Sequence, residues 1–183
     1  MNEINNDNGK RFFRSDQDWW NNACLNFRND HLNGCAEGYK EAADVLVHQV
    51  IEQKLTIDKL IYPIVFLYRH YLEIRFKEII KNGNSYLDNP VDNWGHGLTD
   101  LWNKVRHIVR IRWPETTDED LQAICDCVNE FKEIDPKSTS FRYAKFSTIE
   151  GESLSYINIR NLHDQMEKVE EILEGISMGI KYS

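Results

Sequence analysis

Residues 62–83 form one long segment with helical periodicity that is apolar on almost every side. At about 100° per residue, its apolar side chains fall into two stripes rather than one. The first stripe contains Ile61, Val65, Tyr68, Leu72, Phe76 and Ile79, and the second contains Ile64, Leu67, Tyr71 and Ile74. A surface helix has a single apolar stripe, so this pattern predicts a helix in the middle of a bundle.

Charged side chains interrupt this apolar segment at regular spacing. Arg69, Glu73 and Lys77 follow one another at i, i+4 and i+8, and His70 lies one step round the helix. On a buried helix, such groups are expected to point into a shared crevice or a subunit interface. The alternative is structural: a ladder of i, i+4 ion pairs with His70 filling a gap.

Apolar periodicity predicts further helices along the chain. They cover about residues 16–30, 35–54, 97–112, 117–135 and 158–179. The last carries an unbroken alternation of three- and four-residue steps, which is typical of packing inside a bundle. Thr117 and Asp120 have the spacing of a capping box before the helix at 117–135.

Local signals set the expected boundaries of the first helices. Ser15 is the expected cap of the opening helix, and Asn33 with Gly34 is expected to end it. Gly83 suits a left-handed stop after the central helix. The inward face of the opening helix is predicted to contain Trp19, Trp20, Ala23 and Phe27.

One stretch before the last helix does not have helical periodicity. Glu150 and Gly151 are suited to turning a β-hairpin between residues 141–147 and 153–158. The sequence therefore predicts an all-α protein, an antiparallel helical bundle of five to six helices with a small β-hairpin before the last helix. Residues 1–14 are expected to be a flexible N-terminus, and residues 15–183 a single helical domain.

Composition limits the classes of partner. The formal net charge of −8 argues against a general nucleic-acid coat, because Lys and Arg drive phosphate binding. A local contact is still open at the basic stretch that contains Arg106, His107 and Arg110, where Arg106 and Arg110 share a helix face. The alternative is an exposed face that balances acidic residues elsewhere, such as Glu167 and Glu174.

The sequence has no sign of a membrane-spanning segment, a disulfide scaffold or a metal site. No apolar run reaches the roughly 18 residues that a membrane-spanning helix needs, so we expect a soluble, cytoplasmic protein without a membrane partner. The four cysteines are expected to be reduced thiols. Cys125 and Cys127 would lie on nearly opposite sides of a helix, and we expect neither a metal site nor a cofactor.

Three segments together resemble a known family. FLYRHYLEIRFKEIIKNG at 66–83, GHGLTDLW at 95–102 and FRYAKF at 141–146 are similar to motifs of the HEPN superfamily of prokaryotic helical domains. The resemblance covers about residues 34–180. Carried over to this chain, it points to Glu73, to His96, and to Arg142 with Tyr143 in the Arg-Tyr pair.

The resemblance implies a homodimer associated with phage-defence or toxin modules. Active members of the family cleave RNA without a metal at a site shared across the dimer axis. That activity depends on an arginine followed four to six residues later by a histidine. In this chain the arginine–histidine pairs are closer, at Arg28–His31, Arg69–His70, Arg106–His107 and Arg160–His163.

Two functional hypotheses follow. In the first, the chain acts on or senses RNA or nucleotides as a dimer within such a module, beside a partner protein of the same module. Metal-independent cleavage needs a base, an acid and a cation. The candidate catalytic residues are Arg69, His70, Glu73 and His96, and the candidate phosphate-binding residues are Arg106, His107, Arg110, Arg142 and Tyr143.

In the second hypothesis, the chain is a noncatalytic dimeric interaction module, and the same polar groups hold the bundle and its interface together. His96 then fixes the loop before its helix, and Arg142 anchors the hairpin to the carboxylate of Glu73.

Overall fold

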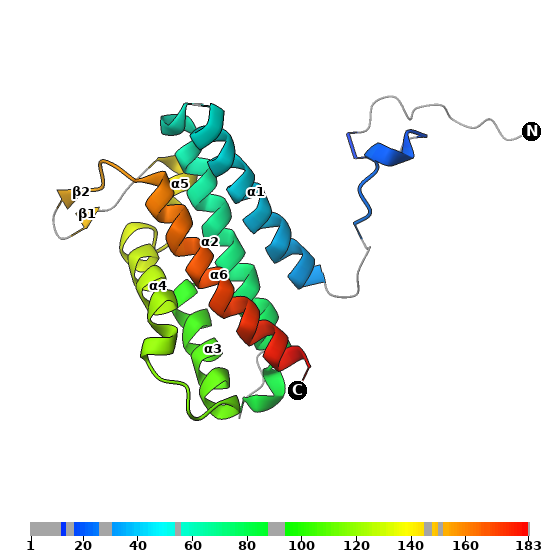
Figure 1. The fold of residues 1–183 in the computed structure, drawn as a ribbon, viewed down its shortest axis with the longest axis vertical. Coiled ribbons are helices and arrows are strands. Elements are labelled where there is room, and N and C mark those ends of the chain that lie inside the picture. Colours follow the sequence, from blue (N-terminus) through cyan, green and yellow to red (C-terminus); the bar gives the residue numbers. More distant parts are fainter. Residues whose placement is uncertain are drawn as a thin grey trace, which may run out of the picture.

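The computed structural model describes residues 12–13, 17–25, 31–53, 56–87, 94–144, 148–149 and 152–182. Its helices are α1 (His31–Gln53), α2 (Ile57–Asn82), α3 (Leu98–Arg112), α4 (Gln122–Ile134), the short α5 (Ser140–Tyr143) and α6 (Ile159–Lys181) (Figure 1). Single 3-10 turns are η2 (Trp19–Asn21), η3 (Asn84–Tyr86) and η4 (Glu119–Leu121). Two short strands, β1 (Thr148–Ile149) and β2 (Glu152–Ser153), pair in antiparallel fashion. The prediction of an all-α helical bundle is confirmed.

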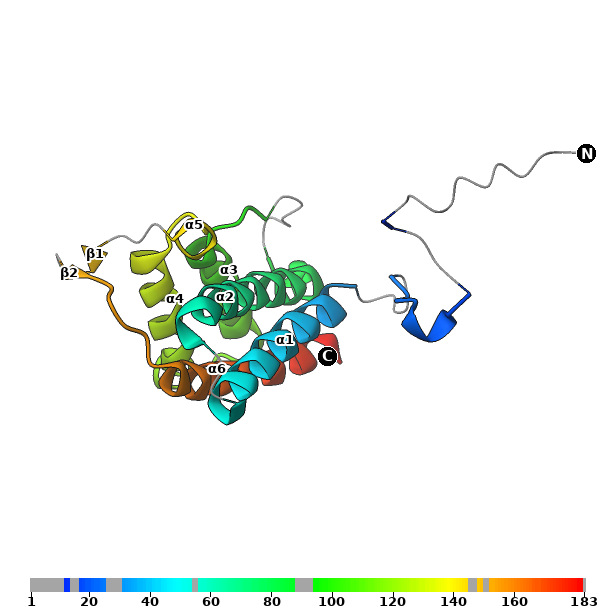
Figure 2. The same cartoon turned by 90° about the horizontal axis from the view of Figure 1, so that it is seen from above.

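Helix α2 lies in the middle of the bundle, between α1, α3 and α6 (Figure 2). Side chains from both predicted apolar stripes of this helix are fully buried, namely Ile64, Tyr68, Tyr71, Leu72, Phe76 and Ile79. Pro63 lies within its second turn. The central position expected for this segment is therefore confirmed.

Contacts between helices fix their directions. Asp44 of α1 contacts Tyr68 of α2, and Asn33 contacts Arg75, so these two helices are antiparallel. Helix α6 runs in the same direction as α2, because His163 contacts Tyr68 and Ser177 contacts Glu78. Helix α3 also runs in this direction, since His96 just before it contacts Glu73 and Ile108 near its end lies beside Gly83. Helix α4 returns in the opposite direction (Figure 1). As a result, the start of α3 is placed beside the middle of α2.

Helix ends follow local chemistry at several positions. The predicted capping box is present: the Thr117 amide donates to Asp120 Oδ2 at 2.7 Å, and the Asp120 amide donates to Thr117 Oγ1 at 3.3 Å. Gly83 ends α2 with φ −93°, so the left-handed stop expected there is wrong. A Cβ at Gly83 would lie 2.8 Å from Ile108 Cγ2, and close approach of α3 therefore explains the glycine.

The predicted opening helix at 16–30 is wrong within the described residues. Among residues 17–25 only the η2 turn is helical, and Trp19 and Trp20 are 61% and 78% exposed instead of facing a core. Their rings stack on each other with centroids 3.6 Å apart. The expected cap Ser15 and the expected core residue Phe27 lie outside the described residues.

Two other boundaries differ from the predictions. Asn33 and Gly34 lie inside α1 rather than ending a helix, because α1 begins at His31. The pairing of β1 with β2 is shorter than the predicted hairpin, and α5 occupies residues 140–143 at its expected start. The Asp135 carboxylate accepts hydrogen bonds from the Thr139 and Ser140 amides, which favours a helical turn there over a strand.

None of the helices within the described ranges is both long enough and apolar enough to cross a membrane.

Candidate functional site

The charged ladder of α2 is buried and converges on one carboxylate. Glu73 accepts hydrogen bonds from Lys77 Nζ to Oε1 at 2.8 Å and from Arg69 Nη1 to Oε2 at 3.2 Å. Arg69 and Glu73 are both buried, whereas Lys77 retains a small exposed area. The i, i+4 spacing read from the sequence thus produces direct ion pairs.

His96 completes this cluster from a different part of the chain. It lies on the turn before α3, where Gly95 has a φ of +59°, and its Nδ1 is 2.8 Å from Glu73 Oε1. Its backbone carbonyl accepts a hydrogen bond from Arg69 Nη2 at 3.4 Å. The His96 side chain is nevertheless 84% exposed. A buried carboxylate therefore orients an imidazole that is open to solvent.

Two opposing effects act on the Glu73 carboxylate. Burial raises the pKa of Glu73, but the hydrogen bonds from Lys77 and His96 and the charge of Arg69 outweigh burial and hold the pKa below its ordinary value. Glu73 is therefore ionised at neutral pH. An ionised partner at Nδ1 favours a proton on that nitrogen, which leaves His96 Nε2 as the basic nitrogen.

Arg69 also connects the cluster to the end of α4. Its Nε lies 3.7 Å from Asp135 Oδ2, and the other oxygen of Asp135 holds the first amides of α5. A small hollow of about 190 Å³ lies here, bounded by Arg69, the first turn of α3 and Asp135. The Arg69 side chain is therefore beside this hollow but remains almost completely buried.

His70 does not join the other predicted catalytic residues. Its ring packs edge-on against Tyr39 of α1, at 4.4 Å between centroids, and stacks with Phe66 at 5.7 Å. Burial lowers the pKa of His70 and favours its neutral form. Of the four predicted catalytic residues, Arg69, Glu73 and His96 come together, and His70 fills an aromatic gap.

The predicted phosphate-binding residues lie on two separate surfaces. Arg106, His107 and Arg110 are exposed on α3 around a shallow hollow of about 500 Å³. Arg110 also forms an ion pair with Asp118. The acidic residues expected to balance this stretch face other cations, since Glu167 contacts Lys40 and Glu174 contacts Arg75.

Arg142 and Tyr143 form the second surface. Both are exposed on α5, Arg142 Nε donates to the Ser138 carbonyl, and the guanidinium lies 5.7 Å from the Tyr143 ring. The expected anchor from Arg142 to Glu73 is wrong, because Arg69 and Lys77 are the cationic partners of that carboxylate and His96 is its third contact.

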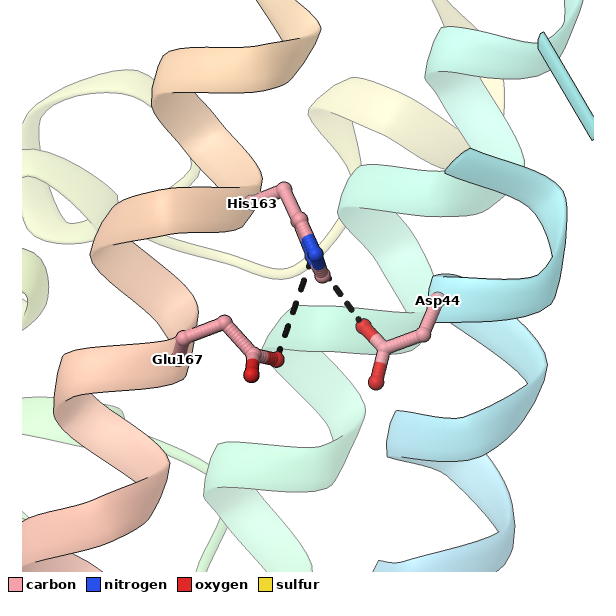
Figure 3. A group of neighbouring side chains, drawn as sticks. All are labelled: Asp44, His163 and Glu167. Carbon is pink, nitrogen blue, oxygen red and sulfur yellow. Dashed lines mark ion pairs between the residues drawn. The ribbon is translucent and has the colours of Figure 1, made fainter. Parts of the chain in front are cut away.

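Sequence reasoning missed a second polar cluster, at the junction of α1, α2 and α6 (Figure 3). Lys40 is buried there and contacts the carboxylates of Asp44, Glu167 and Glu170. The Tyr68 hydroxyl donates to Asp44 Oδ1 at 2.7 Å and lies 3.1 Å from His163 Nδ1. The i, i+4 spacing of Asp44 with His48, and of His163 with Glu167, was the available signal.

A third cluster surrounds the fully buried Arg75. Its guanidinium contacts Asn33 Oδ1 at 2.6 Å and Glu78 Oε2 at 3.3 Å, and it also pairs with Glu174 of α6. This cluster has no solvent-facing imidazole or comparable reactive group among its members, so its role is to join α1, α2 and α6.

Comparisons of the chain with protein-family models, with curated proteins and with solved structures found no match.

Proposed function

We propose that this chain is a HEPN-like component of a bacterial phage-defence or toxin-type module, and that it acts on RNA in the cytoplasm as a homodimer. The family part of this proposal depends on the three resembling segments, and the chemical part on the cluster around Glu73. His96 is the proton-transfer group, Glu73 orients it, and Lys77 with Arg69 supplies positive charge.

The main support for RNA cleavage is the contact between an exposed imidazole and a buried carboxylate. His96 Nδ1 lies 2.8 Å from Glu73 Oε1, and Lys77 Nζ lies 3.5 Å from the same nitrogen. The basic Nε2 can accept the proton of a ribose 2′-hydroxyl, which then attacks the adjacent phosphorus. The Lys77 ammonium is close enough to stabilise the negative charge that develops on the phosphate oxygens.

A dimer supplies the group that a single chain lacks. Cleavage also requires an acid to protonate the leaving 5′-oxygen, and one His96 cannot be both base and acid in the same step. A two-fold axis beside the start of α3 would bring a second His96 to the same phosphate. The exposed basic face of α3 would then guide the RNA backbone through Arg106 and Arg110.

The test uses purified full-length protein, labelled single-stranded RNA and excess chelator. We expect cleavage to products with 2′,3′-cyclic phosphate ends. His96→Ala should reduce the rate by about 100-fold or more, because positioned proton transfer contributes about that factor. His31→Ala, which removes another exposed histidine from α1, is the matched control and should cleave like the wild type. Equal rates for His96→Ala and the wild type would refute the assignment.

A noncatalytic dimeric interaction module is the second candidate. It is favoured by the internal pairing of Glu73, whose two carboxylate oxygens are both occupied by cations of the same chain. It also fits the missing arginine–histidine spacing. Wild-type protein that is folded and dimeric but leaves RNA intact at every concentration would support this candidate instead.

A further inference from the structure

Helices α1 and α6 present two matched pairs of metal-ligating residues. Asp44 and His48 are one helical turn apart on α1, and His163 and Glu167 are one turn apart on α6. Side chains at this spacing share a helix face. Because the two helices are antiparallel and adjacent, the pairs lie opposite each other, and the rings of His48 and His163 are 5.3 Å apart between centroids.

The distances within this cluster are close to those of a metal site. His163 Nδ1 lies 3.5 Å from Asp44 Oδ1 and 3.9 Å from Glu167 Oε1, as the dashed lines of Figure 3 show. One ligand atom from each residue lies within 4.8 Å of the other two. Tetrahedral zinc with bonds of 2.0–2.2 Å holds its ligand atoms roughly 3.4 Å apart. Small side-chain rotations would therefore be sufficient for binding.

The charge balance also favours a divalent cation. Asp44, Glu167 and Glu170 place three carboxylates around the single ammonium of Lys40, at 2.8, 2.5 and 2.6 Å. Two negative charges are left over, and a divalent ion would neutralise them. Lys40 contacts Oδ2 of Asp44 and leaves Oδ1, which faces His163, to the ion. At Glu167 the ammonium contacts Oε1, so an ion would share this carboxylate with Lys40 and bind its other oxygen.

The surroundings provide an outer shell and an entry route. The Tyr68 hydroxyl donates to Asp44 Oδ1 at 2.7 Å and lies 3.1 Å from His163 Nδ1, so it orients both ligands. An ion bound to these two atoms would replace the Tyr68–His163 contact. Glu167 is half exposed, whereas Asp44 and His163 are partly buried. An ion can therefore reach the site from the side of α6 without the bundle opening.

We propose that Asp44, His163 and Glu167 bind a divalent transition metal of the zinc class, with water or His48 in the fourth position. The mixture of imidazole and carboxylate selects such ions over Mg²⁺, which prefers oxygen ligands alone. The site is separate from the His96–Glu73 pair. It does not depend on the RNA-directed function, and the cleavage assay with chelator tests that function independently.

The experiment titrates metal-free full-length protein with Zn²⁺ by calorimetry and with Co²⁺ by absorption spectroscopy. We expect one ion per chain and a cobalt spectrum without thiolate charge-transfer bands. His163→Ala and Glu167→Gln should each weaken binding by at least about tenfold, a loss that even outer-shell substitutions cause. Glu171→Gln, an exposed acid on the same helix, is the matched control and should bind like the wild type.

Two results would overturn the proposal. One is the absence of any Zn²⁺ binding by folded wild-type protein. The other is equal Zn²⁺ affinity in the wild type, His163→Ala and Glu167→Gln. The exposed thiols of Cys24 and Cys35 are the obvious competing ligands. The Cys24→Ser/Cys35→Ser double variant is therefore titrated in parallel, and it should retain the site. Circular dichroism of each variant confirms that lost binding does not reflect unfolding.

Discussion

At the scale of single residues, the protein holds an unusual amount of charge inside its bundle. Arg75 and Glu78 of α2 have no exposed surface, and Lys40, Arg69 and Glu73 have very little. Desolvating such groups costs free energy, which paired charges and hydrogen bonds offset. Removing one partner should therefore be more damaging than the apparent strength of any one pair implies.

Arg75 gives the clearest test of this cost. Arg75→Met would leave the buried Glu78 carboxylate without a cation, and we expect the free energy of unfolding to fall by about 3–5 kcal/mol. Urea denaturation followed by circular dichroism measures the change. The matched control is Arg106→Met on the exposed face of α3, which should change stability by no more than about 0.5 kcal/mol. A wild-type midpoint for Arg75→Met would contradict the role given to this ion pair.

Glu73 predicts a pH dependence of stability. Its pKa is lower in the folded protein than the ordinary value of 4.5. The ionised group therefore contributes stability above pH 4.5, and this contribution is lost as the pH falls through the folded pKa. We expect Glu73→Gln to be destabilised at pH 7 and to approach the wild type as the pH falls below 4.5.

Unfolding free energies of both proteins between pH 7 and pH 3 provide the measurement for Glu73. A difference between wild type and Glu73→Gln that stays constant over this range would show that the carboxylate charge is not the stabilising feature.

Residue-level prediction from the sequence succeeded only where the partners are close along the chain. Arg69, Glu73 and Lys77 could be grouped because helical spacing places them on one face. Their approach to His96 followed only from the family resemblance. The Lys40 cluster was missed although each helix carries an i, i+4 pair, because Asp44 and His163 are far apart in sequence and only the antiparallel packing of α1 and α6 joins the pairs.

At the scale of elements, periodicity identified α2, α3, α4 and α6, because each has an apolar face that the bundle buries. The same reasoning failed for residues 16–30. The aromatic pattern around Trp19 does not indicate whether another element packs against it, and the Trp19 side chain is mostly exposed. The reasoning also failed at Asn33, a residue that favours helix ends when isolated. In the fold its side chain accepts a hydrogen bond from Arg75, so α1 continues through it.

Two glycines of α6 test packing at the same scale. A Cβ at Gly179 would lie 2.6 Å from Trp113 Cζ2, whereas a Cβ at Gly175 would have no neighbour within 4 Å. We expect Gly179→Ala to lower stability by about 1–3 kcal/mol through overpacking. Gly175→Ala should raise stability by up to about 1 kcal/mol, because alanine favours the helix.

The melting temperatures of the two variants, measured by thermal denaturation, separate packing from helix propensity. Both variants replace glycine by alanine in the same helix, so the gain in helix propensity is shared and the difference between them reports packing against Trp113. Similar melting temperatures for both variants would mean that Trp113 can move away from α6 at little cost.

At the scale of the whole molecule, the net charge of −8 contrasts with the exposed basic face of α3. If RNA binds this face, affinity should fall with salt, and Arg106→Ala should reduce the slope of log affinity against log salt concentration by about 0.7 for a lost single-strand phosphate contact. Lys168→Ala on α6 is the charge-matched control and should leave the slope unchanged. Fluorescence anisotropy between low and moderate salt gives the slopes. Identical slopes for the two variants would exclude α3 as the RNA-binding face.

The turn that carries His96 has a consequence for how such a protein can diversify. Its carboxylate partner belongs to the buried central helix, whereas the imidazole extends into solvent from a turn between helices. If His96 is the proton-transfer group, its replacement would abolish reactivity and leave the buried helix packing unchanged. On that proposal, chains with the same bundle would include both enzymes and noncatalytic binding proteins, distinguished by the residue on one short turn.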